Sequence, residues 1–203
     1  MSDVIGYEAG AIVLAAGPSS RLGRPKQLLR LEDQSLVRRA ALAAIDGGCH
    51  PVVVVTGAQA TAVSSELSGV KAIVTFNPHW SMGMGASLRA GLSGLLAAEP
   101  LAAAVVVLMC DQPHLSAQII QQLLIARKTG GLPMAACEYE GTIGPPCCFD
   151  RSMFTALSKI GDAHGAKQLL MRDPKLVARV PWPLGALDID TPEHLKQMPQ
   201  LRG

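Results

Sequence analysis

Two cations and three carboxylates occupy positions from which they could act together on an anionic substrate. Arg21 and Lys26 lie in a loop rich in glycine, proline and serine that follows an apolar run. Asp111 follows a second apolar run, and Asp188 and Asp190 lie in a short segment near the C-terminus. Arginine binds phosphate oxygens bidentately, lysine acts as a mobile point charge, and carboxylates are ligands that Mg²⁺ prefers. These residue types predict phosphoryl chemistry.

The loop with the two cations is itself a candidate phosphate-binding element. The run 11–16 reads as a buried strand, and the glycines, prolines and serines from Gly17 onward exclude regular structure for about ten residues. Such a loop exposes backbone N–H groups that suit phosphate oxygens. An ordinary connecting loop with solvated charges is the alternative. The spacing matches neither G-x-G-x-x-G nor G-x-x-x-x-G-K-[ST], so dinucleotide-binding and Walker-type folds are disfavoured.

Composition limits the class of protein and of ligand. The chain has 203 residues, of which 49% are hydrophobic, 17% charged and only 3% aromatic, so it fits one domain with an aliphatic core. A net charge of +2 and few aromatic residues favour neither nucleic acid nor a membrane surface as partner. No apolar stretch approaches the roughly 18 residues of a membrane span, and no secretory signal is recognisable. We expect a cytoplasmic protein with a small-molecule ligand.

The five cysteines form no C-x-x-C pair, so neither a zinc site nor a disulfide framework is indicated. Cys147 and Cys148 are adjacent, and a reactive pair is one interpretation of them. Buried residues on opposite faces of a strand are the favoured interpretation.

Hydrophobic patterning predicts alternating strands and helices, and hence a mostly parallel sheet covered by helices on both faces. The apolar run 102–109 is the candidate central strand, and Asp111 at its end would lie at the carboxyl edge, where such sheets bind ligands. Asp111 could instead cap the next helix, although Ser116 is a closer cap. The remaining predicted elements are helices at 34–48, 58–67, 86–98 and 119–128, strands at 51–56 and 71–76, an antiparallel edge strand at 133–139, and a short strand at 187–190 before a helix capped by Thr191.

Residues 14–26 carry a specific resemblance. The sequence L-A-A-G-P-S-S-R-L-G-R-P-K resembles the signature loop of the nucleotidyltransferases, and especially of the molybdenum cofactor cytidylyl- and guanylyltransferases. Four later segments resemble the same family in the same order: the stretch 77–91, which in the family meets the base and ribose, G-x-P-x-x-F at 144–149, the G-D turn at 161–167, and D-x-D-T-P at 188–192. The turn at 161–167 has one extra residue, within Ala163–His164, which leaves the role of His164 open. The likeness covers nearly the whole chain.

The resemblance implies an α/β, three-layer, mostly parallel Rossmann-like sheet of the nucleotide-diphospho-sugar transferase type, with a small antiparallel part in the C-terminal half. It implies a single domain, residues 1–203, with a nucleotide-binding half at 10–115 and an acceptor-binding half at 116–203. It implies that the catalytic residues are Arg21, Lys26 and Asp111, and that the metal is bound by Asp111 with Asp188 or, as first choice, Asp190. It implies that the nucleotide is bound by Leu14, Ala15, Ala16, Gly17, Ser19, Gly57, Gly85 and Ser87. It implies that the acceptor is bound by Gly144, Pro146, Gly161, Asp162 and Gly165.

The resemblance also implies a reaction. An enzyme of this kind moves CMP from CTP to molybdopterin with Mg²⁺, releases pyrophosphate and forms molybdopterin cytosine dinucleotide. L-A-A-G is typical of the cytidylyl branch and L-A-G-G of the guanylyl branch, so the methyl group of Ala16 favours CTP over GTP. A contact with a molybdoenzyme or its maturation factor would follow. A guanylyltransferase, a transferase for another phosphorylated acceptor, and a non-catalytic molybdopterin carrier remain alternatives; intact Arg21, Lys26 and Asp111 argue against the carrier.

Overall fold

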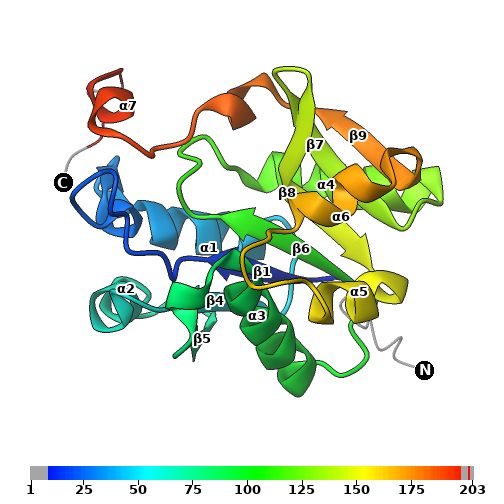
Figure 1. Ribbon diagram of the computed structural model, residues 1–203, viewed down its shortest axis with the longest axis horizontal. Helices are drawn as coiled ribbons and strands as arrows, with labels where there is room; N and C mark the ends of the chain where they lie inside the picture. The colour runs from blue at the N-terminus through cyan, green and yellow to red at the C-terminus, as the bar shows by residue number, and fades with distance from the viewer. Residues whose placement is uncertain (1–8, 198–200, 202–203) are drawn as a thin grey trace.

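A seven-stranded sheet runs through the molecule in a computed structural model that describes residues 9–197 and 201 (Figure 1). The strand order is β5-β4-β1-β6-β8-β7-β9. Strands β5, β4, β1 and β6 are parallel, β8 is antiparallel to β6 and β7, and β9 is parallel to β7. The strands are β1 (Gly10–Leu14), β4 (Val52–Thr56), β5 (Ile73–Phe76), β6 (Ala104–Met109), β7 (Met134–Tyr139), β8 (Thr142–Asp150) and β9 (Val177–Pro181). The predicted fold class, with its small antiparallel part, is confirmed.

Helices cover both faces of this sheet. One face is covered by α1 (Leu36–Asp46), α2 (Ala60–Glu66) and α4 (Ala117–Gly130), and the other by α3 (Met84–Ala98), α5 (Phe154–Ser158) and α6 (Lys167–Arg172). The shorter elements are the hairpin β2 (Arg30–Leu31) and β3 (Gln34–Ser35), the 3-10 turns η1 (Lys26–Leu28), η2 (Trp80–Met82), η3 (Arg151–Met153), η4 (Pro174–Leu176) and η5 (Pro183–Ala186), and helix α7 (Pro192–Gln197). None of the helices described is long and apolar enough to cross a membrane.

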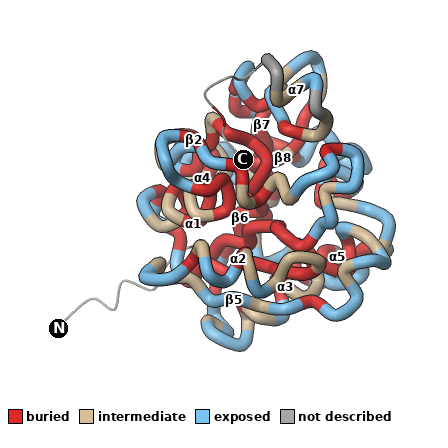
Figure 2. Tube along the Cα trace, turned by 90° about the vertical axis from the view of Figure 1, so that its left-hand side faces the viewer, coloured by how far each residue is buried: buried red, intermediate tan, exposed pale blue. Residues whose placement is uncertain are grey.

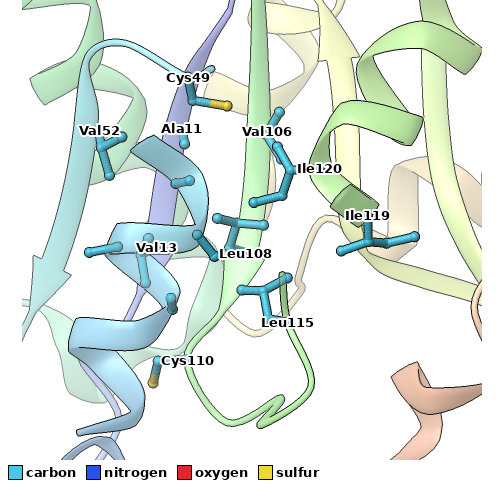
Figure 3. Packing of buried hydrophobic residues seen from close by; sticks show 14 of the residues in the cluster. Ala11, Val13, Cys49, Val52, Val106, Leu108, Cys110, Leu115, Ile119 and Ile120 are labelled. Carbon is cyan, nitrogen blue, oxygen red and sulfur yellow. The ribbon is translucent and has the colours of Figure 1, made fainter. Parts of the chain in front are cut away.

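Alternation along the central strands explains why the sheet needs both helical layers. In β1, Ala11 and Val13 pack with α1 and α4, whereas Ile12 and Leu14 pack with α3. Figure 3 shows the first of these layers, with Leu108 of β6 and the helix α4 on the same side of the sheet. A strand that is apolar on both faces is stable only when both faces are covered. Figure 2 accordingly shows the buried part of the chain at the sheet and the exposed part around it. The prediction that β6 is central is confirmed.

The predicted boundaries differ from the structure at several elements. The strand at 133–139 is not an edge strand, because β9, which was not predicted, pairs with the far side of β7. No strand forms at 187–190; the bond that ties this segment to the end of β6 runs from Ile189 N to Asp111 O at 3.1 Å. Ser116 precedes α4 but its side chain accepts no capping hydrogen bond. The predicted cap at Thr191 is confirmed by a bond from His194 N to Thr191 Oγ1 at 3.3 Å.

Candidate active site

The loop between β1 and η1 is held in shape by Gln27, a residue that the sequence analysis missed. Its side chain is 1% exposed. Its Nε2 donates to the carbonyl oxygens of Ala15 at 3.1 Å and Gly17 at 2.6 Å, and its Oε1 accepts from Ser19 Oγ at 3.3 Å. Ser19 Oγ also accepts from Lys26 N at 3.1 Å. The Ser19 hydroxyl is therefore engaged in closing the loop, with its backbone in the left-handed region at φ 54°.

A cavity of about 370 Å³ lies beside this loop, at the carboxyl ends of the parallel strands. Of the predicted nucleotide-binding residues, five line the cavity: Leu14, Ala15, Ala16, Gly17 and Ser87. Ser19, Gly57 and Gly85 do not line it. Trp80, which was not predicted, does, and its partly buried ring also packs on the core beneath α3. An aromatic ring in such a wall can stack on a nucleotide base.

Gly57 allows the two loops beside the cavity to lie close together. Ala58 N donates to Ala16 O at 3.0 Å, and a Cβ at Gly57 would lie 2.5 Å from that oxygen. The loops that follow β1 and β4 can therefore approach each other only with glycine at this position. Ser87 is held similarly by its neighbours, because Asn77 Nδ2 donates to Ser87 Oγ at 3.0 Å.

Gly85 and the 161–165 turn contact each other instead of lining the cavity. Gly85 N donates to Asp162 O at 2.8 Å, and a Cβ at Gly85 would lie 2.1 Å from Gly161 O. Arg89 forms an ion pair with Asp162, about one helical turn further along α3. Gly161 and Asp162, predicted to bind the acceptor, line neither this cavity nor the larger one that adjoins it. They attach this turn to the N-terminus of α3.

The charged residues meet at one end of the small cavity. Lys26 Nζ donates to Asp111 and, at 2.8 Å, to Asp190 Oδ1, while Arg21 pairs with the other oxygen of Asp190. Asp111 is 5% exposed at the end of β6. Asp190 reaches this point from the far end of the sequence because the fully buried Ile189 anchors its segment in a small apolar cluster with Leu22, Leu29, Leu31, Leu36 and Leu201. Arg21, Lys26, Asp111 and Asp190, predicted from separate segments, therefore lie together.

The charges of this cluster shift one another's pKa. Burial works to lower the pKa of Lys26, but the two carboxylates outweigh it and raise that pKa above its ordinary value. Burial works to raise the pKa of Asp190, but Lys26 and then Arg21 outweigh it and lower that pKa. The pKa of Asp188 is raised, first by burial and then by the negative charges of Asp111 and Asp190. Lys26 is thus a cation and Asp190 an anion at neutral pH.

A larger cavity, of about 910 Å³, adjoins the first. The two share Met84, Met109 and Asp111. Of the predicted acceptor-binding residues only Gly165 lines it. Its other lining residues are Gln112, His114, Tyr139, Glu140, Thr142, Pro145, Ala166, Lys167, Gly185, Ala186, Leu187, Asp188 and His194.

Gln112 organises one wall of the larger cavity. Its Nε2 donates to the carbonyl oxygens of Pro145 at 3.0 Å and Gly185 at 3.2 Å, and Tyr139 Oη donates to Pro145 O at 3.0 Å. A Cβ at Gly144 would lie 2.5 Å from Tyr139 Oη, so Gly144 makes room for this tyrosine. Gly144 and Pro146 shape the wall without lining it, and Pro145 between them lines it. Gln112 directly follows Asp111 in the sequence, which is the one signal that could have identified it.

Asp111 and Asp190 are the described residues best placed to hold a divalent cation, since both carboxylates converge on one ammonium group. No group of three or more His, Cys, Asp or Glu side chains in the described part of the chain is arranged to hold a metal ion. Two carboxylates fit Mg²⁺ or Mn²⁺, because such ions complete their coordination with substrate phosphates and water. Asp188 lies beside the larger cavity instead.

The residues whose roles the sequence left undecided, His164 and the pair Cys147 and Cys148, have structural roles. His164 is exposed, its N–H donates to Gly161 O at 3.0 Å, and it lines neither cavity. Cys147 and Cys148 are buried on opposite faces of β8, as expected. Burial raises the pKa of both thiols, that of Cys148 to about 12, so neither is a thiolate at neutral pH.

Comparison with known proteins identifies the family of this site. Residues 11–177 match the MobA-like NTP transferase domain. The chain belongs to that family. It is 34% identical to nicotine blue oxidoreductase of Paenarthrobacter nicotinovorans over 92% of this chain and 94% of that protein. The crystal structure of Rv0371c from Mycobacterium tuberculosis H37Rv is similar at TM-score 0.80 and 26% identity, covering 95% of this chain and 98% of that one. A complex of the same mycobacterial protein with manganese matches at TM-score 0.71 and 25% identity, covering 94% and 97%.

Proposed function

We propose that this MobA-like nucleotidyltransferase moves CMP from CTP to molybdopterin and releases pyrophosphate. The observation that carries the proposal is the junction of two cavities at Asp111. The cavity of about 370 Å³ is bounded by a glycine-containing loop, and the cavity of about 910 Å³ has room for a second, bulky substrate. Two substrates bound in this way would bring their phosphates together where Asp111, Lys26 and Asp190 meet.

In this mechanism the smaller cavity binds the nucleotide. Trp80 lies against the base, and the N–H groups of the loop beyond Gly17, with Arg21, bind the β- and γ-phosphates. Lys26 supplies positive charge to the α-phosphate as it is attacked. Asp111 and Asp190 would hold Mg²⁺, which neutralises charge on the phosphate oxygens when bound. Phosphoryl transfer needs mainly this positioning and neutralisation.

The bond changes follow from the two anionic substrates. An oxygen of the acceptor phosphate forms a bond to the α-phosphorus of CTP as the bond from that phosphorus to the bridging oxygen breaks, and pyrophosphate leaves with the electron pair. The acceptor phosphate is already ionised near neutral pH, so no general base is required. The product of this step is a dinucleotide, here molybdopterin cytosine dinucleotide.

The larger cavity is the proposed acceptor site. Its wall offers the ring of Tyr139, the face of Pro145 and the thioethers of Met84 and Met109, which suit a planar ring system. Its polar groups include Gln112, whose Oε1 is buried and makes no hydrogen bond. A heterocycle with N–H donors, such as a pterin, fits this combination better than a sugar phosphate does.

Choice of nucleotide is assigned to Ala16. Its methyl group is buried in the same core cluster as Leu14 and Trp80, and the residue lines the cavity wall. A Cβ at this position narrows the space for a base, which favours a pyrimidine. A methyl-sized difference is worth about 1–3 kcal/mol in discrimination.

Pyrophosphate release tests the proposal directly. Purified protein is incubated with Mg²⁺ and molybdenum-loaded molybdopterin, and with CTP, GTP, ATP or UTP in turn. We expect release with CTP, dependent on the acceptor and reduced by Asp111→Asn at least about a hundredfold. Release with GTP would identify a guanylyltransferase, and release only with a different phosphorylated acceptor would contradict the molybdopterin assignment. Tight CTP binding without release would indicate a carrier.

The relative of 34% identity suggests one competing activity, because it is named an oxidoreductase. If a nicotinamide nucleotide were the reductant of such an activity, NADPH would be consumed in the presence of an oxidised heterocycle. Spectrophotometric loss of NADPH that persists in Asp111→Asn would favour it over nucleotidyl transfer. The loop at 14–26 lacks the G-x-G-x-x-G spacing of dinucleotide-binding loops, so we expect no such loss.

A further inference from the structure

Lys26 lies at the point where the two candidate metal-binding carboxylates converge. Its Nζ contacts Asp111 and, at 2.8 Å, Asp190 Oδ1. The Lys26 side chain is 17% exposed and that of Asp111 only 7%. An ammonium group therefore supplies the positive charge that these two carboxylates need in a partly buried site.

The same place cannot serve the lysine and a divalent cation together. Mg²⁺ holds its oxygen ligands at about 2.0–2.1 Å, closer than any hydrogen bond, so an ion held by both carboxylates would occupy the position of the ammonium. Two cations sharing that position would also repel each other strongly, because solvent screening is weak in a partly buried site. An ion held by Asp111 and Asp190 together must replace Lys26.

We propose that Lys26 is a resident counter-ion that competes with the divalent cation for Asp111 and Asp190. This inference rests on the metal site of the proposed function and adds a property to it: the carboxylates are blocked until the lysine leaves. Without the lysine, the two carboxylates bind a divalent ion more tightly. With it, the protein alone binds that ion weakly.

The geometry of the loop allows the side chain to leave while the backbone stays. Lys26 N is held by Ser19 Oγ at 3.1 Å, and the neighbouring Gln27 is locked into the loop by its own hydrogen bonds. Lys26 also lines the smaller cavity, so a triphosphate bound there offers its ammonium a second anionic partner. Arg21 remains paired with Asp190 and continues to balance part of its charge. Metal would then enter together with the nucleotide.

Mn²⁺ binding without nucleotide tests this competition. Calorimetry and EPR of free Mn²⁺ give the dissociation constant for the wild-type protein, Lys26→Met and Arg24→Met. Arg24 is the matched control, because it is an exposed cation of the same loop and its loss removes the same net charge. We expect Lys26→Met to bind Mn²⁺ at least about tenfold more tightly than the wild type, and Arg24→Met to differ by less than about twofold.

A double variant shows whether the gain arises at the proposed carboxylates. Lys26→Met/Asp111→Asn should lose the gain. Lys26→Gln, which removes the charge but keeps a donor for one carboxylate, should show a smaller gain and replaces the methionine variant if that one does not fold.

The outcomes distinguish the competition by Lys26 from the existence of the metal site at Asp111 and Asp190. Equal Mn²⁺ affinity in the Lys26 and Arg24 variants, with binding that still depends on Asp111, overturns the competition and leaves the metal site intact. Binding that is unchanged by Asp111→Asn overturns the metal site and the competition with it. Absence of binding from every variant, Lys26→Met included, overturns the competition, and the metal site is then tested by Mn²⁺ binding in the presence of CTP.

Discussion

Gln27→Met removes the hydrogen bonds that close the phosphate loop while leaving a side chain of similar length and shape. The Ala15 carbonyl, in a residue that is buried, loses its bond from Nε2, which costs about 1–2 kcal/mol. Gly17 is exposed, so water can replace the second bond, and its loss costs about 0.5–1 kcal/mol. The expected decrease in the free energy of unfolding is therefore about 1.5–3 kcal/mol, or about 3–12 °C in Tm for a domain of this size.

Thermal unfolding and CTP binding by calorimetry measure the two consequences. Because the loop backbone is the proposed triphosphate site, Gln27→Met should also weaken CTP binding at least about tenfold, beyond what partial unfolding explains. Gln121→Met is the matched control: Gln121 is exposed and makes one long bond, from Nε2 to Asp46 O at 3.4 Å. Its Tm should change by less than about 2 °C.

The reasoning fails if Gln27→Met is as stable as Gln121→Met, because the buried hydrogen bonds would then contribute nothing. It also fails in part if stability falls while CTP affinity stays the same. That result would make Gln27 a packing residue with no influence on the loop's binding conformation.

Three further predictions follow from the site. The raised pKa of Asp188 means that its ionisation opposes folding as pH rises, so Asp188→Asn should raise Tm above that of the wild type at pH 7 but not at about pH 3. The lowered pKa of Asp190 has the opposite sign, so Asp190→Asn should lower Tm at pH 7 and lower it less at about pH 3; equal changes at the two pH values in thermal melts would refute both. Ala16→Gly should move the ratio of kcat/KM for CTP and GTP toward GTP by about 10–200-fold, and an unchanged ratio would remove Ala16 from base selection. Arg89→Met should release the turn attached through Asp162, seen as faster limited proteolysis near that turn and a Tm lower by about 2–4 °C; a cleavage rate equal to the wild type would show that the ion pair is dispensable.

The sequence predicted those parts of the fold that depend on local pattern. The apolar run before Gly17 forms β1, the most apolar run forms the central strand β6, and Thr191 caps the helix that follows it. Each of these depends on residues close together in the chain, where hydrophobic period and capping chemistry act directly. The edge strand β9 was missed because its five residues include Arg179 and Pro181, which are unusual in a buried strand but acceptable at an edge.

The site shows where such reasoning ends. A glutamine beside a lysine looks like a surface residue in the sequence, yet Gln27 is buried because two loop carbonyls need its amide. Gly85 was assigned to the nucleotide from the resemblance, but it makes room for a turn 76 residues later, a relation that no local pattern carries. Asp188 and Asp190 are equivalent in the sequence pattern, and only the structure shows that Asp190 is the one that meets Lys26.

Asp111 has two roles in the structure, and they must be separated before its variants are interpreted. Its side chain pairs with Lys26, and its backbone oxygen accepts from Ile189 N at 3.1 Å, which holds the segment that carries Asp190. Asp111→Asn keeps the backbone bond and changes only the charge, whereas Asp190→Asn removes charge from the same cluster without touching Asp111. If both substitutions abolish turnover while Tm changes differ, the shared loss comes from the charge that the two carboxylates present together, as a metal-binding pair requires.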